Sequence, residues 1–207
     1  METSIPGSMA HMQTDPHAQF LDIVLGNENI RTLTDRLAEL ELPDAYLAAG
    51  CLCQTVWNNV SGFPPDYGII DYDVLYCDLD DLSWEGEDRT IRRCAAAFAE
   101  LGVNVEVRNQ ARVHLWYPAK FGVPHQPLHS TKEGIDSFLH CCTALGLRKT
   151  PEGYDVYAPF GFVDVFRMVV RPNYSYGLPG WYEEKASRWK RTWPGVVVEP
   201  WCAPGPQ

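Results

Sequence analysis

The sequence predicts a mixed α/β (α+β) domain in which a small mixed sheet is flanked by N-terminal and C-terminal helices. The first reason is residues 69–77, Ile-Ile-Asp-Tyr-Asp-Val-Leu-Tyr-Cys, an apolar run typical of a buried strand. The second reason is the order of the segments around it. Helical spacing precedes this run, strands and helices alternate around it, and helical spacing returns near the C-terminus.

Two helices are expected before the sheet, in a cover over residues 15–42. The first begins at Asp15-Pro16, a capping residue followed by a proline at the first helical position, and ends at Gly26. The second repeats apolar residues at helical spacing and ends before Pro43. Residues 1–14 lack the basic and apolar regions of a signal peptide and resemble an expression scar, so we exclude them from the fold.

The predicted core covers residues 43–173 of a main domain at 15–180. Val-Asn-Val-Glu-Val at 103–107 alternates as a strand with one polar face does. Along the chain the other expected elements are a strand at 45–49, a helix at 51–59, a loop at 61–68, the strand at 69–77, an acidic loop at 78–88 and a helix at 89–101.

Helical signals dominate the C-terminal half. Ser130 and Glu133 form a capping box, which predicts a helix from there to about Leu145. The remaining expected elements are a helical turn or short helix at 110–117, a strand at 154–157, a helix or strand at 163–170, and a C-terminal helix with its tail at 181–207.

Charge and cysteine usage narrow the class of protein. A formal net charge of −10 disfavours long-range capture of duplex nucleic acid, although a local basic patch could still bind it. The seven cysteines are an odd number without zinc-ribbon spacing, as expected of reduced thiols in a cytoplasmic protein. No stretch of 18 apolar residues exists, so we expect no membrane span.

Asp71 and Asp73 are the most informative residues. On a strand, residues two apart project from the same face, and aspartate is depleted from strand interiors because a bare buried carboxylate is costly. A bound Mg²⁺ or Mn²⁺ would compensate, because hard cations prefer oxygen ligands. Glu106, on the next predicted strand, is the third candidate ligand and completes a cluster suited to phosphoryl or nucleotidyl transfer. The alternative for all three is a solvent-facing strand that pairs with Arg or Lys.

Two further segments carry candidate binding residues. Gly50 and Cys51 open a helix directly after a strand, where free backbone N–H groups can hold phosphate, although a tight turn explains the glycine equally well. Arg112 and His114, beside Trp116, could contact phosphate or stack a base; alternatively, Arg112 pairs with an acid of the loop at 78–88. The basic and aromatic residues of 181–193 suit either nucleic-acid contacts or an amphipathic helix packed through its tryptophans.

Taken together, these motifs resemble a known family. Gly50 at a helix start, Asp71-x-Asp73 on a strand and Glu106 on a later strand resemble the DNA polymerase beta-like nucleotidyltransferase superfamily. Within it, the chain from about Leu42 to Asn173 resembles a bacterial nucleotidyltransferase-like family of unassigned substrate. That closer resemblance rests on Ala49-Gly50, Thr55-Val56-Trp57-Asn58, Ile70-Asp71-Tyr72-Asp73-Val74, Asn109 to Tyr117, Val156 to Gly161 and Val170-Arg171-Pro172-Asn173.

The resemblance implies the minimal nucleotidyltransferase fold and a metal-dependent transfer of a nucleoside monophosphate from an NTP to an acceptor. Asp71 and Asp73 would hold the metal, and Glu106 would help to activate the acceptor hydroxyl. Cys51 departs from the Gly or Ser that usually follows the helix-start glycine. A catalytically degenerate nucleotide-binding module is therefore one alternative. Another is a phosphatase of the haloacid dehalogenase type, with Asp71 as nucleophile, although here Val74-Leu75-Tyr76 continue the strand.

The acceptor is expected to be a small molecule or a protein rather than duplex nucleic acid. Eight acids lie between Asp71 and Asp88, which predicts an anionic mouth to the site before metal binds. An NTP arrives with its own metal, whereas a long polyanion would need many lysines and arginines that this region lacks. The basic segment from Lys185 to Trp193 would change this expectation if it folded back over Asp71.

Overall fold

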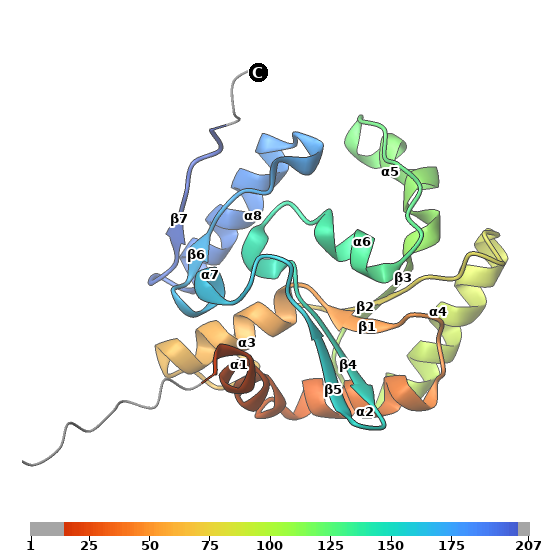
Figure 1. Cartoon of the computed structure of the whole chain (residues 1–207), viewed down its shortest axis with the longest axis horizontal. Helices are drawn as coiled ribbons and strands as arrows, with labels where there is room; N and C mark the ends of the chain where they lie inside the picture. The colour runs from red at the N-terminus through yellow and green to blue at the C-terminus, as the bar shows by residue number, and fades with distance from the viewer. Residues whose placement is uncertain (1–14, 203–207) are drawn as a thin grey trace, which may run out of the picture.

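The computed structural model describes residues 15–202, so the expression scar expected at 1–14 lies outside the described residues (Figure 1). In the order of the chain, its helices and strands are α1 (Pro16–Leu25), α2 (Glu28–Glu39), β1 (Tyr46–Ala48), α3 (Gly50–Ser61), β2 (Tyr72–Tyr76), α4 (Trp84–Phe98), β3 (Val105–Asn109), α5 (Val113–Phe121), α6 (Thr131–Asp136), β4 (Gly146–Thr150), β5 (Gly153–Tyr157), α7 (Val163–Phe166), β6 (Val169–Val170), α8 (Pro179–Thr192) and β7 (Val197–Val198).

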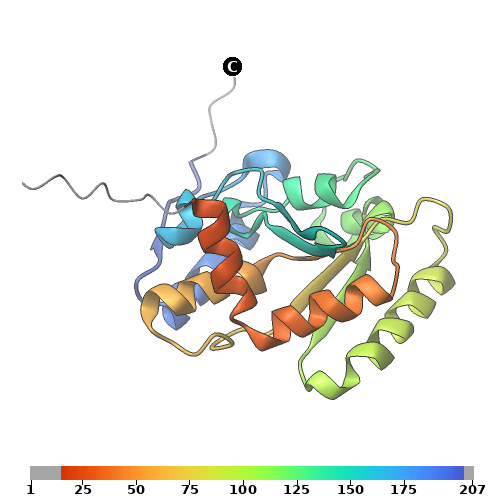
Figure 2. The same ribbon diagram turned by 60° about the horizontal axis from the view of Figure 1, so that its bottom comes forward.

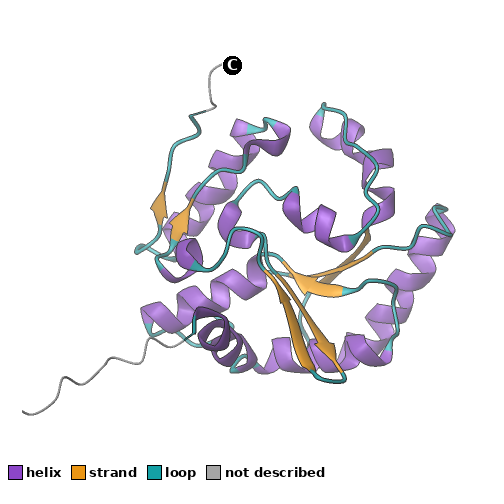
Figure 3. Ribbon diagram, viewed as in Figure 1, coloured by secondary structure: helices purple, strands orange, loops and turns teal. Residues whose placement is uncertain are grey.

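Five strands form the central sheet in the order β3-β2-β1-β4-β5 (Figure 3). Strands β2 and β3 are parallel, whereas β1 pairs antiparallel with both β2 and β4, and β4 and β5 form an antiparallel hairpin. The sheet is therefore mixed, and the predicted α/β class is confirmed. A separate pair of short parallel strands, β6 and β7, lies beside α8.

The two faces of the sheet have different neighbours. Tyr72, Val74 and Tyr76 of β2 belong to the main hydrophobic core with residues of the first four helices. Leu75, on the opposite face, packs with Tyr46 and with Ile135 of α6. Figures 1 and 2 show α2 and α4 on one side of the sheet and α5 and α6 on the other. The residues at alternate positions of β2, Asp73 among them, thus face the side with α5 and α6.

Helix α8 is part of the main core. Trp189 and Trp193 are nearly fully buried and make edge-to-face contacts with Trp57 of α3, with ring centroids 5.7 and 5.5 Å apart. The Trp193 indole N–H donates to the amide oxygen of Asn58 at 2.7 Å. The predicted tryptophan face of this helix is confirmed, and the helix is fixed against the body of the protein.

One predicted helix is wrong over most of its length. Helix α6 ends at Asp136 instead of continuing to about Leu145. The Asn173 side-chain amide donates to the carbonyl oxygens of Asp136 and Phe138, at 2.7 and 2.9 Å, so backbone groups that a longer helix would use are bonded elsewhere. The chain then reaches β4, which sequence analysis did not predict.

Other elements differ at their ends. Helix α4 begins at Trp84, inside the predicted acidic loop, because the Ser83 hydroxyl accepts the Gly86 N–H at 3.0 Å and acids favour a first turn. The segment at 163–170, predicted as helix or strand, contains both α7 and β6. Within residues 15–202, no helix has the length and apolar character that a membrane span requires.

Candidate active site

The three predicted carboxylates gather at one region of the sheet. Asp73 lies on β2 directly beside Glu106 of the parallel strand β3. Asp71 immediately precedes β2 and is partly exposed. Because paired residues of adjacent strands project to the same face, Asp73 and Glu106 share the side of the sheet that faces α5 and α6.

Burial and the charges of its neighbours perturb the pKa of the Asp73 carboxyl. Partial burial, the charge of Asp71 and then that of Glu106 raise the pKa of Asp73 to about 7, against smaller opposing effects of Lys185 and Arg108. Within residues 15–202, neither Asp71 nor Asp73 has a side-chain hydrogen bond or an ion pair. Glu106 differs, because its carboxylate lies 3.5 Å from Arg108.

Two unpartnered carboxylates fit a divalent cation. Carboxylate oxygens are the ligands that Mg²⁺ and Mn²⁺ prefer, and a bound cation would offset the repulsion between Asp71 and Asp73. In the described residues, no group of three or more His, Cys, Asp or Glu side chains is arranged to hold a metal ion. Asp71 and Asp73 would therefore be the protein ligands, and Glu106, the predicted third ligand, is not grouped with them for this role.

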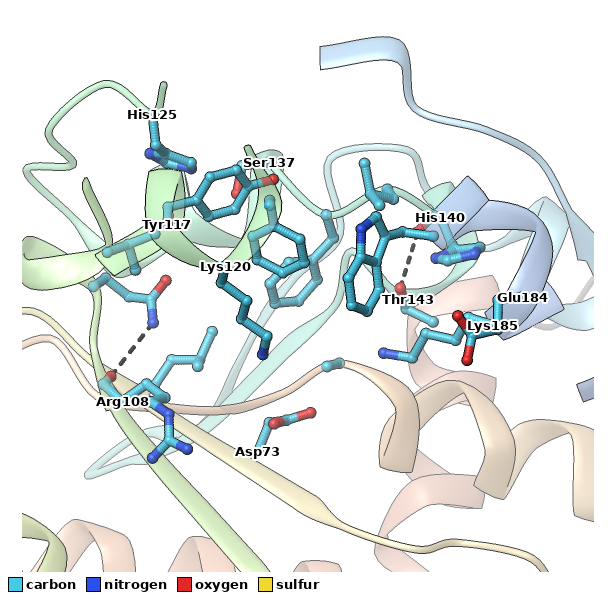
Figure 4. Close-up of a pocket in the computed structure, with 18 of the residues that line it drawn as sticks. Asp73, Arg108, Tyr117, Lys120, His125, Ser137, His140, Thr143, Glu184 and Lys185 are labelled. Carbon is cyan, nitrogen blue, oxygen red and sulfur yellow. Dashed lines mark hydrogen bonds between the residues drawn. The ribbon is translucent and has the colours of Figure 1, made fainter. Parts of the chain in front are cut away.

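A cavity of about 500 Å³ opens above Asp73, between α5 and α8 (Figure 4). Asp73 and Leu75 line its floor, whereas Asp71 and Glu106 are outside the lining set. Five cations and two carboxylates line it, namely Arg108, Lys120, Lys185, Arg188 and Arg191 with Asp73 and Glu184. The predicted anionic mouth is therefore wrong for this cavity, because the basic segment of α8 folds back over β2.

The acids of the 78–88 segment are engaged elsewhere. Asp81, in the loop before α4, pairs with Arg89 at 2.8 Å, and Asp88 pairs with Arg92 within α4 at 2.9 Å. Neither acid lines the cavity beside Asp73. A run of negative charge in the sequence thus contributes to another surface of the molecule.

Aromatic rings form the upper wall of the cavity. Tyr117 and Phe121 of α5 lie with ring centroids 4.4 Å apart, and Phe121 meets Trp181 of α8 edge to face at 5.0 Å. Trp181 is 45% exposed, although it is one of the largest side chains of the chain. Sequence analysis did not single out Lys120, Phe121 or Arg108, since each looks like an ordinary surface residue until α5 and α8 are brought together.

Gly50 and Cys51 are at the start of α3, as predicted. The residue before the helix, Ala49, lines the cavity and has a left-handed backbone, with φ of 66°. A Cβ added to Gly50 would lie 2.8 Å from the Gln54 amide nitrogen, so the glycine permits this approach. Cys51 is 1% exposed and its thiol donates to the Ala48 carbonyl at 3.3 Å. Burial, followed by the charge of Asp73, raises the pKa of this thiol well above its usual range.

Arg112 is held away from the cavity. Its guanidinium forms a buried ion pair with Glu87 and donates through Nε to the Leu82 carbonyl at 3.0 Å. Glu87 also accepts the backbone N–H of Asn109 at 2.9 Å, which ties α4 to the end of β3. This arrangement matches the alternative in which Arg112 pairs with an acid of the 78–88 segment.

His114 is likewise outside the set of residues that line the cavity. Its Nδ1 atom is buried and has no hydrogen-bond partner among the described residues. The neighbouring His125 does line the cavity, and its Nδ1 lies 2.7 Å from the Gln126 carbonyl oxygen. Burial lowers the pKa of His125, so its imidazole is neutral at physiological pH.

An unpartnered carboxylate on the floor of a cation-lined cavity supplies donors for both a metal ion and phosphate groups, as a protein that handles nucleotides requires. Residues 35–198 match the sequence profile of a family described as "Nucleotidyltransferase", and the chain belongs to this nucleotidyltransferase family. The expected resemblance is thus confirmed at the level of the family. Because the chain belongs to this family, the alternative of a phosphatase of the haloacid dehalogenase type is set aside.

A solved NMR structure supports the same fold. It is described as revealing a CCA-adding enzyme head domain and matches with a TM-score of 0.75 and 23% sequence identity, covering 93% of this chain and 100% of that chain. At this identity the likeness shows the fold alone. Comparison with curated proteins gives no match.

Proposed function

We propose that this chain is a metal-dependent nucleotidyltransferase that moves a nucleoside monophosphate from an NTP to a small-molecule or protein acceptor in the cytoplasm. The observation that carries the proposal is the carboxylate of Asp73, which has no partner and lies on the floor of a cavity lined by five cations. An unpartnered carboxylate suits a metal, and the surrounding cations suit the polyphosphate that the metal accompanies.

The transfer needs few groups from the protein. An acceptor hydroxyl attacks the α-phosphorus, the bond to the β-phosphate oxygen breaks, and pyrophosphate leaves. Bound Mg²⁺ or Mn²⁺ would supply charge neutralisation for the phosphates. Asp71 and Asp73 would hold the metal, the start of α3 at Gly50 and Cys51 would orient phosphate through its backbone N–H groups, and Glu106 would take the proton of the acceptor.

Thermal unfolding with nucleotides tests this proposal. A ligand that binds only the native state raises the Tm, so an NTP with Mg²⁺ or Mn²⁺ should raise the Tm of the wild-type protein. In Asp73→Asn the metal-dependent part of that rise should disappear. Asp80→Asn is the matched control, because it removes the same charge from an exposed loop position. An unchanged metal-dependent rise in Asp73→Asn would contradict the assignment of the metal to this site.

The alternative of a nucleotide-binding module without turnover is favoured by one observation. The Cys51 thiol is buried and bonds to the Ala48 carbonyl, so the Cys51 side chain offers no hydroxyl to a triphosphate. Incubation with α-labelled NTP, metal and fractionated cell extract separates the two functions. A transferase gives a labelled acceptor, whereas a binding module gives the Tm rise without any labelled product.

A further inference from the structure

The cations of the cavity lack the partners that most other cations of the molecule have. Lys120, Lys185, Arg188 and Arg191 form no ion pair with any described residue. Most arginines elsewhere are paired, as Arg148 is with Asp44 and Asp155, and Arg171 with Asp164. Four unpaired cations around one cavity repel one another, and an anionic ligand would relieve this repulsion.

Helix α8 presents three of these cations along one side. Lys185, Arg188 and Arg191 follow at intervals of three residues, so successive side chains lie on neighbouring turns. A neighbouring side of the helix is fixed, because Tyr182, Ala186 and Trp189 are buried in the main core. The cationic side is therefore held over the cavity by packing, and a ligand finds it already in place.

Helix α5 supplies the fourth cation from the facing wall. The Lys120 ammonium lies 5.7 Å from the Trp116 ring centroid and 5.2 Å from that of Phe121, so two aromatic faces hold it. Figure 4 shows Lys120 and Lys185 reaching into the cavity from opposite sides above Asp73. Lys185 is near enough to lower the pKa of that carboxyl.

We propose that Lys120, Lys185, Arg188 and Arg191 form a polyphosphate clamp, which binds the triphosphate of the nucleotide and selects it over monophosphates. The proposal rests on the proposed function and assigns to it binding residues outside the predicted helix start and carboxylates. Cations on two facing helices match a chain of several phosphates better than they match one compact anion. Each phosphate group offers oxygen atoms to a separate charge-assisted hydrogen bond.

Inorganic tripolyphosphate, measured by calorimetry with EDTA present, tests the clamp without the metal. We expect the wild-type protein to bind tripolyphosphate more tightly than pyrophosphate, and pyrophosphate more tightly than phosphate. The double variant Lys185→Ala with Arg188→Ala should bind tripolyphosphate at least about tenfold more weakly. It loses two charge-assisted hydrogen bonds, and together these contribute more binding free energy than a tenfold change in affinity requires.

The matched control is Arg89→Ala with Arg92→Ala. These two arginines carry the same total charge on exposed pairs of α4, away from the cavity, so tripolyphosphate affinity should change less than about twofold. The clamp is overturned if the wild-type protein shows no metal-free binding of tripolyphosphate, or if the α8 variant, with wild-type Tm, binds it as the wild type does.

Asp73→Asn separates the clamp from the proposed function. Without metal, this variant should bind tripolyphosphate at least as tightly as the wild type, because it removes a negative charge from the cavity floor. If the metal-dependent effects of NTP fail but this binding and its loss in the α8 variant persist, the clamp stands and the metal assignment falls. If the metal-dependent effects of NTP are observed but tripolyphosphate does not bind without metal, the metal site is retained and the clamp is rejected.

Discussion

At the scale of single residues, Asp73 links stability to pH. Its pKa in the folded protein is about 7, above the ordinary value of 3.8, so between these values the native state binds the proton more tightly than the unfolded chain does. This contribution to stability is present below about pH 4 and is lost as the pH rises through 7.

Asp73→Asn should therefore stabilise the metal-free protein at pH 8. The expected gain is on the order of 1–2 kcal/mol, after allowance for screening by water in the cavity, and it should shrink toward pH 5. Urea unfolding of both proteins at the two pH values measures it. A variant that is equally or less stable than the wild type at pH 8 would show that the carboxylate is not repelled in the fold.

Arg112 and Glu87 form the second residue-scale test. Both side chains are about 10% exposed, and Glu87 also holds the Asn109 N–H. Glu87→Ala leaves the guanidinium buried without its partner, so the free energy of unfolding should fall by about 3–5 kcal/mol. Urea unfolding measures this loss, and Arg112→Met added to Glu87→Ala should recover part of it.

The sequence predicts some of these residues better than others. Asp71 and Asp73 stand out because two carboxylates in an apolar strand violate strand preferences. The interior position of Arg112 has no comparable signal, because an arginine beside His and Trp suits both a ligand and a buried ion pair. Lys120 and Phe121 gain their significance only from contacts across the cavity with α8.

At the scale of elements, α8 is held at both of its ends. The Trp193 indole donates to the buried Asn58 oxygen at 2.7 Å, and Tyr182 lies within hydrogen-bond distance of the Val170 and Glu199 carbonyls, at 2.9 and 2.6 Å. Trp193→Phe retains a ring but leaves the Asn58 oxygen without this donor. We expect a loss of about 1–3 kcal/mol in urea unfolding.

The matched control for that variant is Trp181→Phe, which changes the same residue type at an exposed position of the same helix. Its effect on stability should stay within about 0.5 kcal/mol. Equal losses in both variants would show that the hydrogen bond to Asn58 contributes nothing to the attachment of α8.

The spacing of apolar residues predicts most of the helices and strands but not the residues at which they end. Apolar spacing predicts α1, α2 and α3 well, because short-range capping and helical repeats determine them. The end of α6 depends on Asn173, far along the chain, which bonds the carbonyls of Asp136 and Phe138. Such a long-range contact leaves no local pattern, so the prediction extends the helix over residues 137–145, where the structure has no α-helix, and misses β4 at Gly146–Thr150.

At the scale of the whole molecule, the charge is divided unevenly. The chain carries −10 overall, yet five of its cations line one cavity with only two carboxylates. These cations are gathered around one cavity of about 500 Å³, where a small anion would contact several of them at once, whereas a long duplex would also meet the rest of the chain, in which acids outnumber cations. Because the basic segment of α8 does fold back over β2, the proposed small acceptor now rests on the confinement of these cations to one cavity and no longer on the net charge.

Labelled duplex DNA should accordingly not bind at ~50 mM salt, where non-specific association is strongest. Fluorescence anisotropy should show a Kd weaker than roughly 100 μM, the upper end of the usual non-specific range. Micromolar binding that falls steeply with salt and disappears in Lys185→Ala with Arg188→Ala would instead make a nucleic acid the acceptor.

The place of α8 in the chain has a consequence for protein synthesis. The ribosome delivers β2 and β3, with all three carboxylates, well before it delivers the helix that carries Lys185, Arg188 and Arg191. A nascent chain that has only formed the sheet therefore lacks most of the positive charge around Asp73. If the clamp holds the triphosphate as proposed, the chain gains this ability only after the C-terminal tryptophans have packed against Trp57.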